Sequence, residues 1–273
     1  MSYIDLHTHT HCSDGTLSPE ELVTKAKEAG LEALAITDHD AVDGVKRARS
    51  VNTPGLEVIS GVELSAREGP SDVHILGYFI DLSNEKLLSS LETFRVHRIN
   101  RAKEIVTRLN KLKVPLQWDA VLSQKQGENT SIGRPHIARA LLEGEYVNSI
   151  SDAFNQYLGN NAPAFVPKFF FSVSEAIEII HKANGLAVLA HPGSLKRDEL
   201  IENFVNLGLD GLEVIHPEHN NTLKIYYNRL AAKYGLVTTG GSDYHGSRVG
   251  RCDLGGMNVP YQHLVDLKCL RKE

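Results

Sequence analysis

Short apolar runs in this sequence end repeatedly in histidine or acidic residues. Each run has the length of a buried strand, and stretches with helical signals separate one run from the next. This alternation predicts parallel strands joined by helices, which is an α/β barrel whose carboxyl strand ends form one face. Residues of the metal-ligand type from six predicted strands should then converge on that face: His7 with His9, His39, Glu63, His74, His191, and Asp243 with His245.

Local signals support the alternation. A helix is predicted from Ser18, because Ser-Pro-Glu-Glu supplies an N-cap, a proline at the first helical position and a glutamate three residues after the cap. Gly30 is a suitable end for that helix. The apolar run from 33 to 37 predicts the next strand, and 42–50 predicts the next helix. Further strands are expected at 57–63, 72–78, 186–190, 210–215 and 237–241.

The pattern changes in the middle of the chain. One helical period runs from 84 to 112, and short helices are expected after it, including 135–142 and 151–158. We therefore expect a barrel domain made of residues 1–84 and 169–273. A helical insertion at 85–168 should interrupt it and select the substrate.

The stretch HTHTHCSDG, at 7–15, predicts a metal site. If the first strand continues to His9, its two-residue period turns His7 and His9 to the same side. Asp14 follows a turn signal and can return toward the same ion. His11 would share that face only if the strand continued past His9, so it is the weaker candidate. The alternative is an exposed polar loop, and the His-x-His spacing followed by an aspartate argues against it.

Nine ligand-type residues at recurrent strand ends are more than one ion needs. Their mixture of imidazoles and carboxylates suits two or three divalent ions, with Mn favoured and Zn, Fe or Mg as alternatives. Asp38 and Asp40 flank His39 and are expected to be hydrogen-bond partners or caps, because metal-bound imidazoles donate their other N–H to such groups.

Composition narrows the class of protein. Across 273 residues, 41% are hydrophobic, 23% are charged and the formal net charge is -5, which excludes a uniformly basic nucleic-acid coat. Cys12, Cys252 and Cys269 are too few and too scattered for a disulfide framework. The sequence shows no signal-peptide pattern and no apolar run near the roughly 18 residues of a membrane span. We expect a soluble, cytoplasmic protein with no membrane contact and no obligate protein partner.

Six motifs resemble the PHP (polymerase and histidinol phosphatase) family of metallophosphoesterases, in the family's order. They are DLHTHTHCSDG at 5–15, TDHD at 37–40, GVELS at 61–65, HILGY at 74–78, AHPG at 190–193 and GSDYHG at 241–246. The resemblance implies a distorted (β/α)7 barrel. It also implies nine metal ligands: His7, His9, Asp14, His39, Glu63, His74, His191, Asp243 and His245.

The resemblance further implies how these ligands divide among the ions. Glu63 would bridge two of them. His7, His9 and Asp243 would bind one, and His74 and His191 the other. Asp14, His39 and His245 would hold a third.

Clustered divalent ions favour phosphoester hydrolysis, because they activate water, hold the phosphate and neutralise its developing charge. We find no GxSxG elbow, Walker loop or Rossmann fingerprint in the sequence. The expected reaction is attack by metal-bound hydroxide on a phosphomonoester, with no side-chain nucleophile.

The insertion contains candidate substrate-binding residues. Gly-Arg-Pro-His at 133–136 opens a predicted helix, so its free N–H groups, Arg134 and His136 would together face an anion. Arg95, Arg98 and Arg101 recur every three residues and form a basic stripe, for which a solvated helix surface is the alternative. Of these, we select Arg134, His136, Arg98 and Arg101 as substrate-binding residues.

These stretches also resemble a PHP subgroup with a helical insertion. That subgroup dephosphorylates nucleoside 3',5'-bisphosphates and nucleotide 5'-ends, and some members trim RNA in the 5'-3' direction. The resemblance implies a nucleotide or short oligonucleotide as the substrate. The alternatives are a histidinol-phosphate-type phosphatase and a non-catalytic metal-binding regulatory module. The complete ligand set and the absence of a polymerase domain argue against the second of these.

Overall fold

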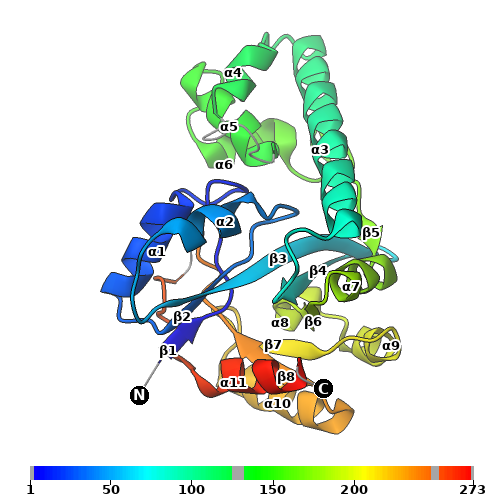
Figure 1. The fold of residues 1–273 in the computed structure, drawn as a ribbon. Coiled ribbons are helices and arrows are strands. Elements are labelled where there is room, and N and C mark those ends of the chain that lie inside the picture. Colours follow the sequence, from blue (N-terminus) through cyan, green and yellow to red (C-terminus); the bar gives the residue numbers. More distant parts are fainter. Residues whose placement is uncertain (1–2, 125–131, 247–251, 272–273) are drawn as a thin grey trace. The chain divides into compact units, whose positions relative to one another are not determined.

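A computed structural model describes residues 3–124, 132–246 and 252–271. The chain divides into two compact units, one made of Met1–Ser90 and Phe170–Glu273, the other of Leu91–Phe169. The first unit contains the strands, and the second is helical (Figure 1). The two units are described separately below.

The first unit is a nearly closed sheet, ordered β8-β7-β6-β4-β3-β2-β1-β9. Its two sides approach each other where the backbone N–H of Leu6 donates to the carbonyl of Gly240 at 3.2 Å. The expected distorted (β/α)7 barrel is confirmed. The strands are β1 (Tyr3–Asp5), β2 (Ala33–Ile36), β3 (Glu57–Glu68), β4 (Ser71–Tyr78), β5 (Phe171–Ser172), β6 (Leu186–Leu189), β7 (Gly211–Ile215), β8 (Val237–Gly240) and β9 (Val259–Pro260).

Helices surround this sheet in the first unit (Figure 1). Ser18 caps α1 in a complete capping box with Glu21, as the sequence predicted, and Gly30 follows the helix with a positive φ of 75°. The helices are α1 (Pro19–Glu28), α2 (Asp43–Ser50), α7 (Val173–Lys182), α8 (Pro192–Leu195), η2 (Asp198–Leu200), α9 (Ile201–Asn206), α10 (Asn221–Tyr234) and α11 (Gln262–Leu270).

Two details of the sheet differ from the prediction. The first strand ends at Asp5, so His7 and His9 lie in the segment after it, where Thr8 forms a single bridge with Tyr244. The fourth strand runs antiparallel to its neighbours β3 and β6. Only Gly69 and Pro70 connect β3 to β4, and so short a connection makes a hairpin, because a parallel crossover needs a dozen or more residues.

The second unit has its own hydrophobic core. Leu109 of α3 (Glu85–Lys111) packs there with Ile137 and Leu141 of α5 (Arg134–Glu143), all fully buried. The other helices are α4 (Trp118–Leu122), α6 (Ile150–Ala153) and the π-helical turn η1 (Phe154–Leu158). The long helix at 84–112 and the helix at 135–142 were both predicted from the sequence. Among the described helices, none combines the length and apolar character that a membrane span requires.

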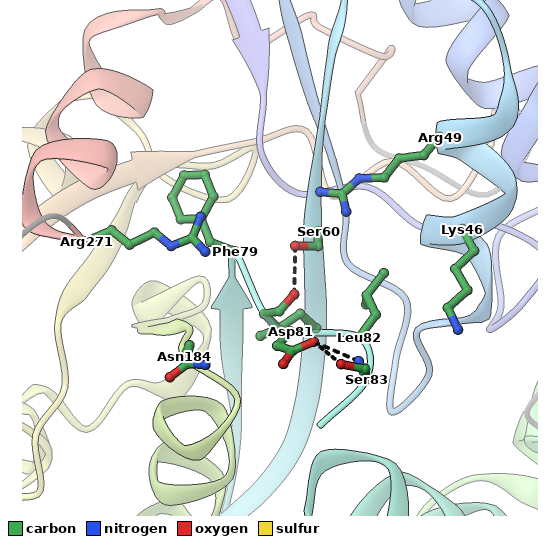
Figure 2. A pocket seen from close by; sticks show the side chains of 10 residues that line it. Lys46, Arg49, Ser60, Phe79, Asp81, Leu82, Ser83, Asn184 and Arg271 are labelled. Carbon is green, nitrogen blue, oxygen red and sulfur yellow. Dashed lines mark hydrogen bonds between the residues drawn. The ribbon is translucent and has the colours of Figure 1, made fainter. Parts of the chain in front are cut away.

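A cavity of ≈ 600 Å³ in the first unit has several basic side chains in its lining (Figure 2). Arg49 lies in the last turn of α2, and Arg271 follows α11, so these two cations complement the negative helix C-termini. Asp81 accepts hydrogen bonds from the backbone N–H and the Oγ of Ser83, which ties it to its own turn. The charges of Arg49, Arg271 and Asp81 therefore have a structural role.

Candidate metal centre

The structure brings all nine predicted ligand side chains together in the first unit, from six segments of the chain. Most lie just after a strand, as the sequence predicted, but Glu63 lies within β3, which extends past its predicted end, and His74 lies within β4. Three groups have ligand atoms within 4.8 Å of one another: His9, Asp14, His39 and His245; His7, His9 and Asp243; and His39, Glu63 and His74. His191 adjoins the third group through Glu63, at 3.2 Å.

Glu63 is the centre of this arrangement, and its two carboxylate oxygens face different histidines. Its Oε1 lies 2.8 Å from His74 Nδ1 and 3.2 Å from His191 Nε2. Its Oε2 lies 3.0 Å from His39 Nδ1, and 3.4 Å and 3.3 Å from the Nε2 atoms of His7 and His9. A carboxylate with histidines at both oxygens has the geometry to bridge two cations.

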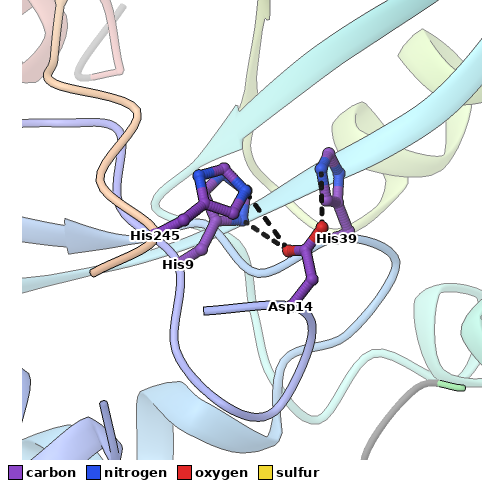
Figure 3. A group of neighbouring side chains, drawn as sticks. All are labelled: His9, Asp14, His39 and His245. Carbon is purple, nitrogen blue, oxygen red and sulfur yellow. Dashed lines mark ion pairs between the residues drawn. The ribbon is translucent and has the colours of Figure 1, made fainter. Parts of the chain in front are cut away.

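Asp14 is the carboxylate of a second group (Figure 3). Its Oδ1 lies 3.3 Å from His245 Nε2 and 3.9 Å from His9 Nδ1. Its Oδ2 lies 3.9 Å from His39 Nε2. The turn after His9 thus returns Asp14 toward the histidines, as predicted.

Asp243 is the carboxylate of the remaining group. Its Oδ1 lies 3.3 Å from His7 Nε2 and 3.2 Å from His9 Nε2. The Asp243 side chain is 31% exposed, whereas those of His7 and His9 are fully buried. Asp243 therefore joins a buried pair of imidazoles to a side that solvent can reach.

The donor atoms of these groups fit bound cations. Buried polar atoms are normally hydrogen-bonded, so a cluster of exceptions requires an explanation. Seven such atoms converge here with no hydrogen-bond partner among the described residues: His7 Nε2, His9 Nδ1 and Nε2, Asp14 Oδ1, His39 Nδ1, Glu63 Oε2 and His74 Nδ1. Imidazole nitrogens and carboxylate oxygens are the donors that Mn, Fe and Zn accept.

The electrostatics keep the carboxylates of the site ionised. Burial opposes the charge of Glu63, but His39 and His74 outweigh burial and hold the pKa of Glu63 well below its ordinary value. Burial likewise opposes the charge of Asp14, and His39 and His245 hold its pKa well below the ordinary value. Both carboxylates are therefore available to cations near neutral pH.

The imidazoles of the site differ from one another. Burial lowers the pKa of His39 to about 3, against the attraction of Glu63 and Asp14 for its proton. Burial also opposes protonation of His9, but the nearby carboxylates of Asp243 and Glu63 raise its pKa to about 10. A cation bound between these carboxylates would take the place of the proton on His9.

Two carboxylates that are not among the nine predicted ligands hold the neighbouring loop and strand in place. Asp38 accepts hydrogen bonds from the backbone N–H and Oγ1 of Thr10 and from Oγ of Ser13. Asp40 accepts from the backbone N–H and Oγ of Ser65. These are the supporting roles expected for both aspartates, although these donors are loop and strand groups.

Two further groups were not predicted. The buried carboxylate of Glu213 lies 2.9 Å from His7 Nδ1, and His216 Nε2 lies 3.6 Å from Asp243 Oδ2. The signal for Glu213 was an acidic residue inside the apolar strand Gly-Leu-Glu-Val-Ile. His11, the weaker candidate, pairs with Arg47 at 2.8 Å.

The proposed substrate-binding residues lie in the second unit. Arg134 donates to the carbonyl of Leu158 at 3.1 Å and to Asn160 at 3.2 Å. His136 is buried, and its Nδ1 accepts the N–H of Gly133 at the start of α5. Arg101 donates to the carbonyl of Val166 at 2.8 Å. A Cβ on Gly133 would lie 3.5 Å from Arg98 Nη1, so Arg98 adjoins the same helix start. Substrate binding by these residues stays a prediction.

Known proteins resemble this chain over nearly its whole length. The PHP domain family model matches residues 5–170. A 5'-3' exoribonuclease of Haemophilus influenzae is 36% identical over 88% of this chain and 89% of its own. A 3',5'-nucleoside bisphosphate phosphatase of Chromobacterium violaceum is 31% identical over 93% of this chain and 91% of its own.

A solved structure agrees with these matches. A crystal structure of a Bifidobacterium adolescentis protein, described as a metal-dependent phosphoesterase, superposes with a TM-score of 0.89. It is 36% identical and covers 98% of this chain and 96% of its own. Its fold, the six motifs and the family match agree. The chain therefore belongs to the PHP domain family and is a hydrolase that acts on phosphoester bonds.

Proposed function

We propose that this protein hydrolyses phosphomonoesters of nucleotides, with two or three divalent ions held by the nine residues described above. The observation that carries the proposal is the position of Glu63, whose oxygens face His74 and His191 on one side and His7, His9 and His39 on the other. The names of the exoribonuclease and the bisphosphate phosphatase support nucleoside 3',5'-bisphosphates, 5'-nucleotides or the 5'-end of short RNA as substrates.

The chain's own residues would supply position and charge. When bound, divalent ions would lower the pKa of water and neutralise the phosphate, and Mn is favoured by the mixed nitrogen and oxygen donors. Glu63 would fix the spacing between two ions, because both of its oxygens face imidazoles. The partly exposed Asp14 and Asp243 would hold ions at the side where substrate arrives.

We further propose that the helical insertion selects the substrate. Arg134 and Arg98 adjoin the start of α5, where the positive end of the helix dipole favours an anion. Arg101 and His136 would support this region, since each holds a backbone group of the second unit. Together they would bind a phosphate or the nucleoside of the substrate.

Phosphate release from a panel of esters, with purified protein and Mn²⁺, tests the proposal. We expect kcat/KM to be highest on a nucleoside 3',5'-bisphosphate, a 5'-nucleotide or a 5'-phosphorylated oligoribonucleotide. Histidinol phosphate is the control, and a preference for it would contradict the nucleotide assignment. Full metal content without turnover on any ester would instead identify a regulatory module.

Chelation tests whether the ions are needed. Turnover should disappear in metal-verified apoprotein and return when Mn²⁺ is restored. An unchanged rate in that apoprotein would contradict a metal-dependent reaction.

A further inference from the structure

The end of β7 faces the metal centre without supplying any of the nine predicted ligands. Glu213, within β7, is 0% exposed, and His216, the first residue after it, is 3% exposed. Burying a carboxylate and an imidazole is costly unless each has a partner. The partners of both residues include predicted metal ligands.

Glu213 contacts two of those ligands with its two oxygens. Its Oε1 lies 2.9 Å from His7 Nδ1, and its Oε2 accepts the backbone N–H of His191 at 2.7 Å. An ionised carboxylate only accepts hydrogen bonds, so the hydrogen lies on Nδ1 of His7. The lone pair of a neutral His7 ring is then on Nε2, which is the atom that faces Glu63 and Asp243.

The contact with His191 supports an unusual backbone. His191 has a φ of 28°, in the left-handed region that residues with a Cβ rarely adopt. Such a conformation persists where neighbouring groups hold it. The hydrogen bond from the His191 N–H to Glu213 is one of the contacts that hold it, and the His191 ring reaches Glu63 from this backbone.

His216 has the opposite tautomer to His7. Its Nδ1 accepts the backbone N–H of Glu218 at 3.2 Å, so a neutral ring carries its hydrogen on Nε2. That Nε2 has no hydrogen-bond partner in the described part of the chain and lies 3.6 Å from Asp243 Oδ2. A nitrogen that carries a hydrogen cannot bind a metal, so His216 is a donor and not a tenth ligand. It points at the Asp243 oxygen that does not face His7 and His9.

We propose that Glu213 and His216 are positioning residues for the ion of the His7, His9 and Asp243 group. Glu213 fixes the tautomer of His7 and the backbone of His191, and His216 places its Nε2–H beside the second oxygen of Asp243, at 3.6 Å. Outer partners, meaning groups that hydrogen-bond to the metal ligands without binding the metal, orient those ligands and raise metal affinity. The inference rests on the proposed metal binding, but it concerns affinity for the ion and needs no particular substrate.

Mn²⁺ titration into wild-type and variant apoprotein, followed by calorimetry and elemental analysis, tests the proposal. We expect Glu213→Gln to weaken binding of one ion by about 10- to 100-fold, as for other outer partners, while the remaining ions bind as in the wild type. Glu199→Gln is the matched control, because it makes the same change at an exposed side chain that pairs with Arg197. His216→Leu should weaken binding of the same ion. His216→Gln should recover part of the lost affinity, because an amide can still donate a hydrogen bond.

The melting temperature of each apoprotein separates positioning from folding. If Glu213→Gln does not fold, Glu213→Asp keeps the charge but shortens the side chain, and the same loss of one ion is expected. Wild-type Mn²⁺ affinity and stoichiometry in both the Glu213 and His216 variants would overturn the proposal. Unchanged affinity with a raised KM in the His216 variants would make His216 a substrate contact instead. A wild-type protein that binds Mn²⁺ but hydrolyses no phosphoester would contradict the proposed function and leave this test valid.

Discussion

The Oε1 atom of Glu63 lies 2.8 Å from Nδ1 of His74, and the register of the β3–β4 hairpin explains this contact. His74 pairs with Ser65, which lies two residues after Glu63 on β3. Residues two apart on a strand share a face, so Glu63 and His74 are diagonal neighbours on one face of the hairpin. The sheet itself therefore fixes two of the proposed ligands relative to each other.

Removing the charge of Glu63 should disrupt more than one ion. In Glu63→Gln the amide keeps the size of the side chain, but its NH₂ group cannot accept a cation, so one of the two facing oxygens is lost. We expect turnover to fall by several orders of magnitude and metal content to fall with it. Activity assays and elemental analysis measure both, with Glu68→Gln on the same strand as the control. Normal metal content in Glu63→Gln would contradict a bridging carboxylate.

Removing Asp14 should affect a single ion. Its oxygens face His245 and His39, and Asp14 itself belongs to this group alone, whereas His9 and His39 each belong to a second group as well. We expect Asp14→Ala or His245→Ala to lower hydrolysis by several orders of magnitude, while the fold and the other ions are retained. Circular dichroism and metal content distinguish these effects, and Asp72→Ala is an exposed control. Near-normal turnover with full metal content would make the ligand assignment wrong.

Much of this site could be predicted from the sequence, because ligand side chains at strand ends leave a local pattern. The segment around His7 and His9 and the turn to Asp14 both show it. The antiparallel direction of β4 leaves no such pattern, because alternating hydrophobic and polar residues are the same in a parallel and an antiparallel strand. The two-residue connection at Gly69 and Pro70 was the available signal for the hairpin.

Outer partners were harder to predict than ligands. A buried glutamate within an apolar strand indicates a polar partner, but it does not identify that partner. The contact between Glu213 and His7 joins residues 206 positions apart in the sequence, so only the closed sheet reveals it.

Stability should depend on pH through His181. The hydrogen bond to Asp210, at 2.8 Å, outweighs partial burial and raises the pKa of His181 above its ordinary value. A raised folded-state pKa means that the stabilisation is complete below the unfolded value of about 6.5, and is lost as pH rises through the folded value. The His181 side chain is 39% exposed, so solvent screening should keep the contribution below about 1 kcal/mol.

Urea unfolding at pH 5.5 and pH 8.5 measures this contribution. The wild type should exceed His181→Gln in free energy of unfolding by more at pH 5.5 than at pH 8.5. A difference that is larger at the higher pH would reverse the sign and contradict the ion pair.

The last prediction concerns Arg134 and the selection of the substrate. If its guanidinium binds a substrate phosphate at the start of α5, Arg134→Ala should weaken transition-state binding by roughly 1.5 to 3 kcal/mol, the range for a charge-assisted hydrogen bond. Arg134→Lys should restore only part of this, because an ammonium cannot make a planar two-pronged contact. The measurement is kcat/KM on a nucleoside 3',5'-bisphosphate and on p-nitrophenyl phosphate, with metal content determined for each variant.

The comparison of the two substrates decides between binding and structure. Arg134 also donates to the carbonyl of Leu158 and to Asn160, so its loss could disturb the second unit and act on both esters alike. A residue that binds the nucleotide should instead lower kcat/KM more on the bisphosphate than on the small ester. Arg95→Ala is the matched control, because Arg95 pairs with Glu92 on the exposed side of α3 and is not among the proposed binding residues. Equal losses on the two esters, or no loss on the bisphosphate, would contradict substrate selection by the insertion.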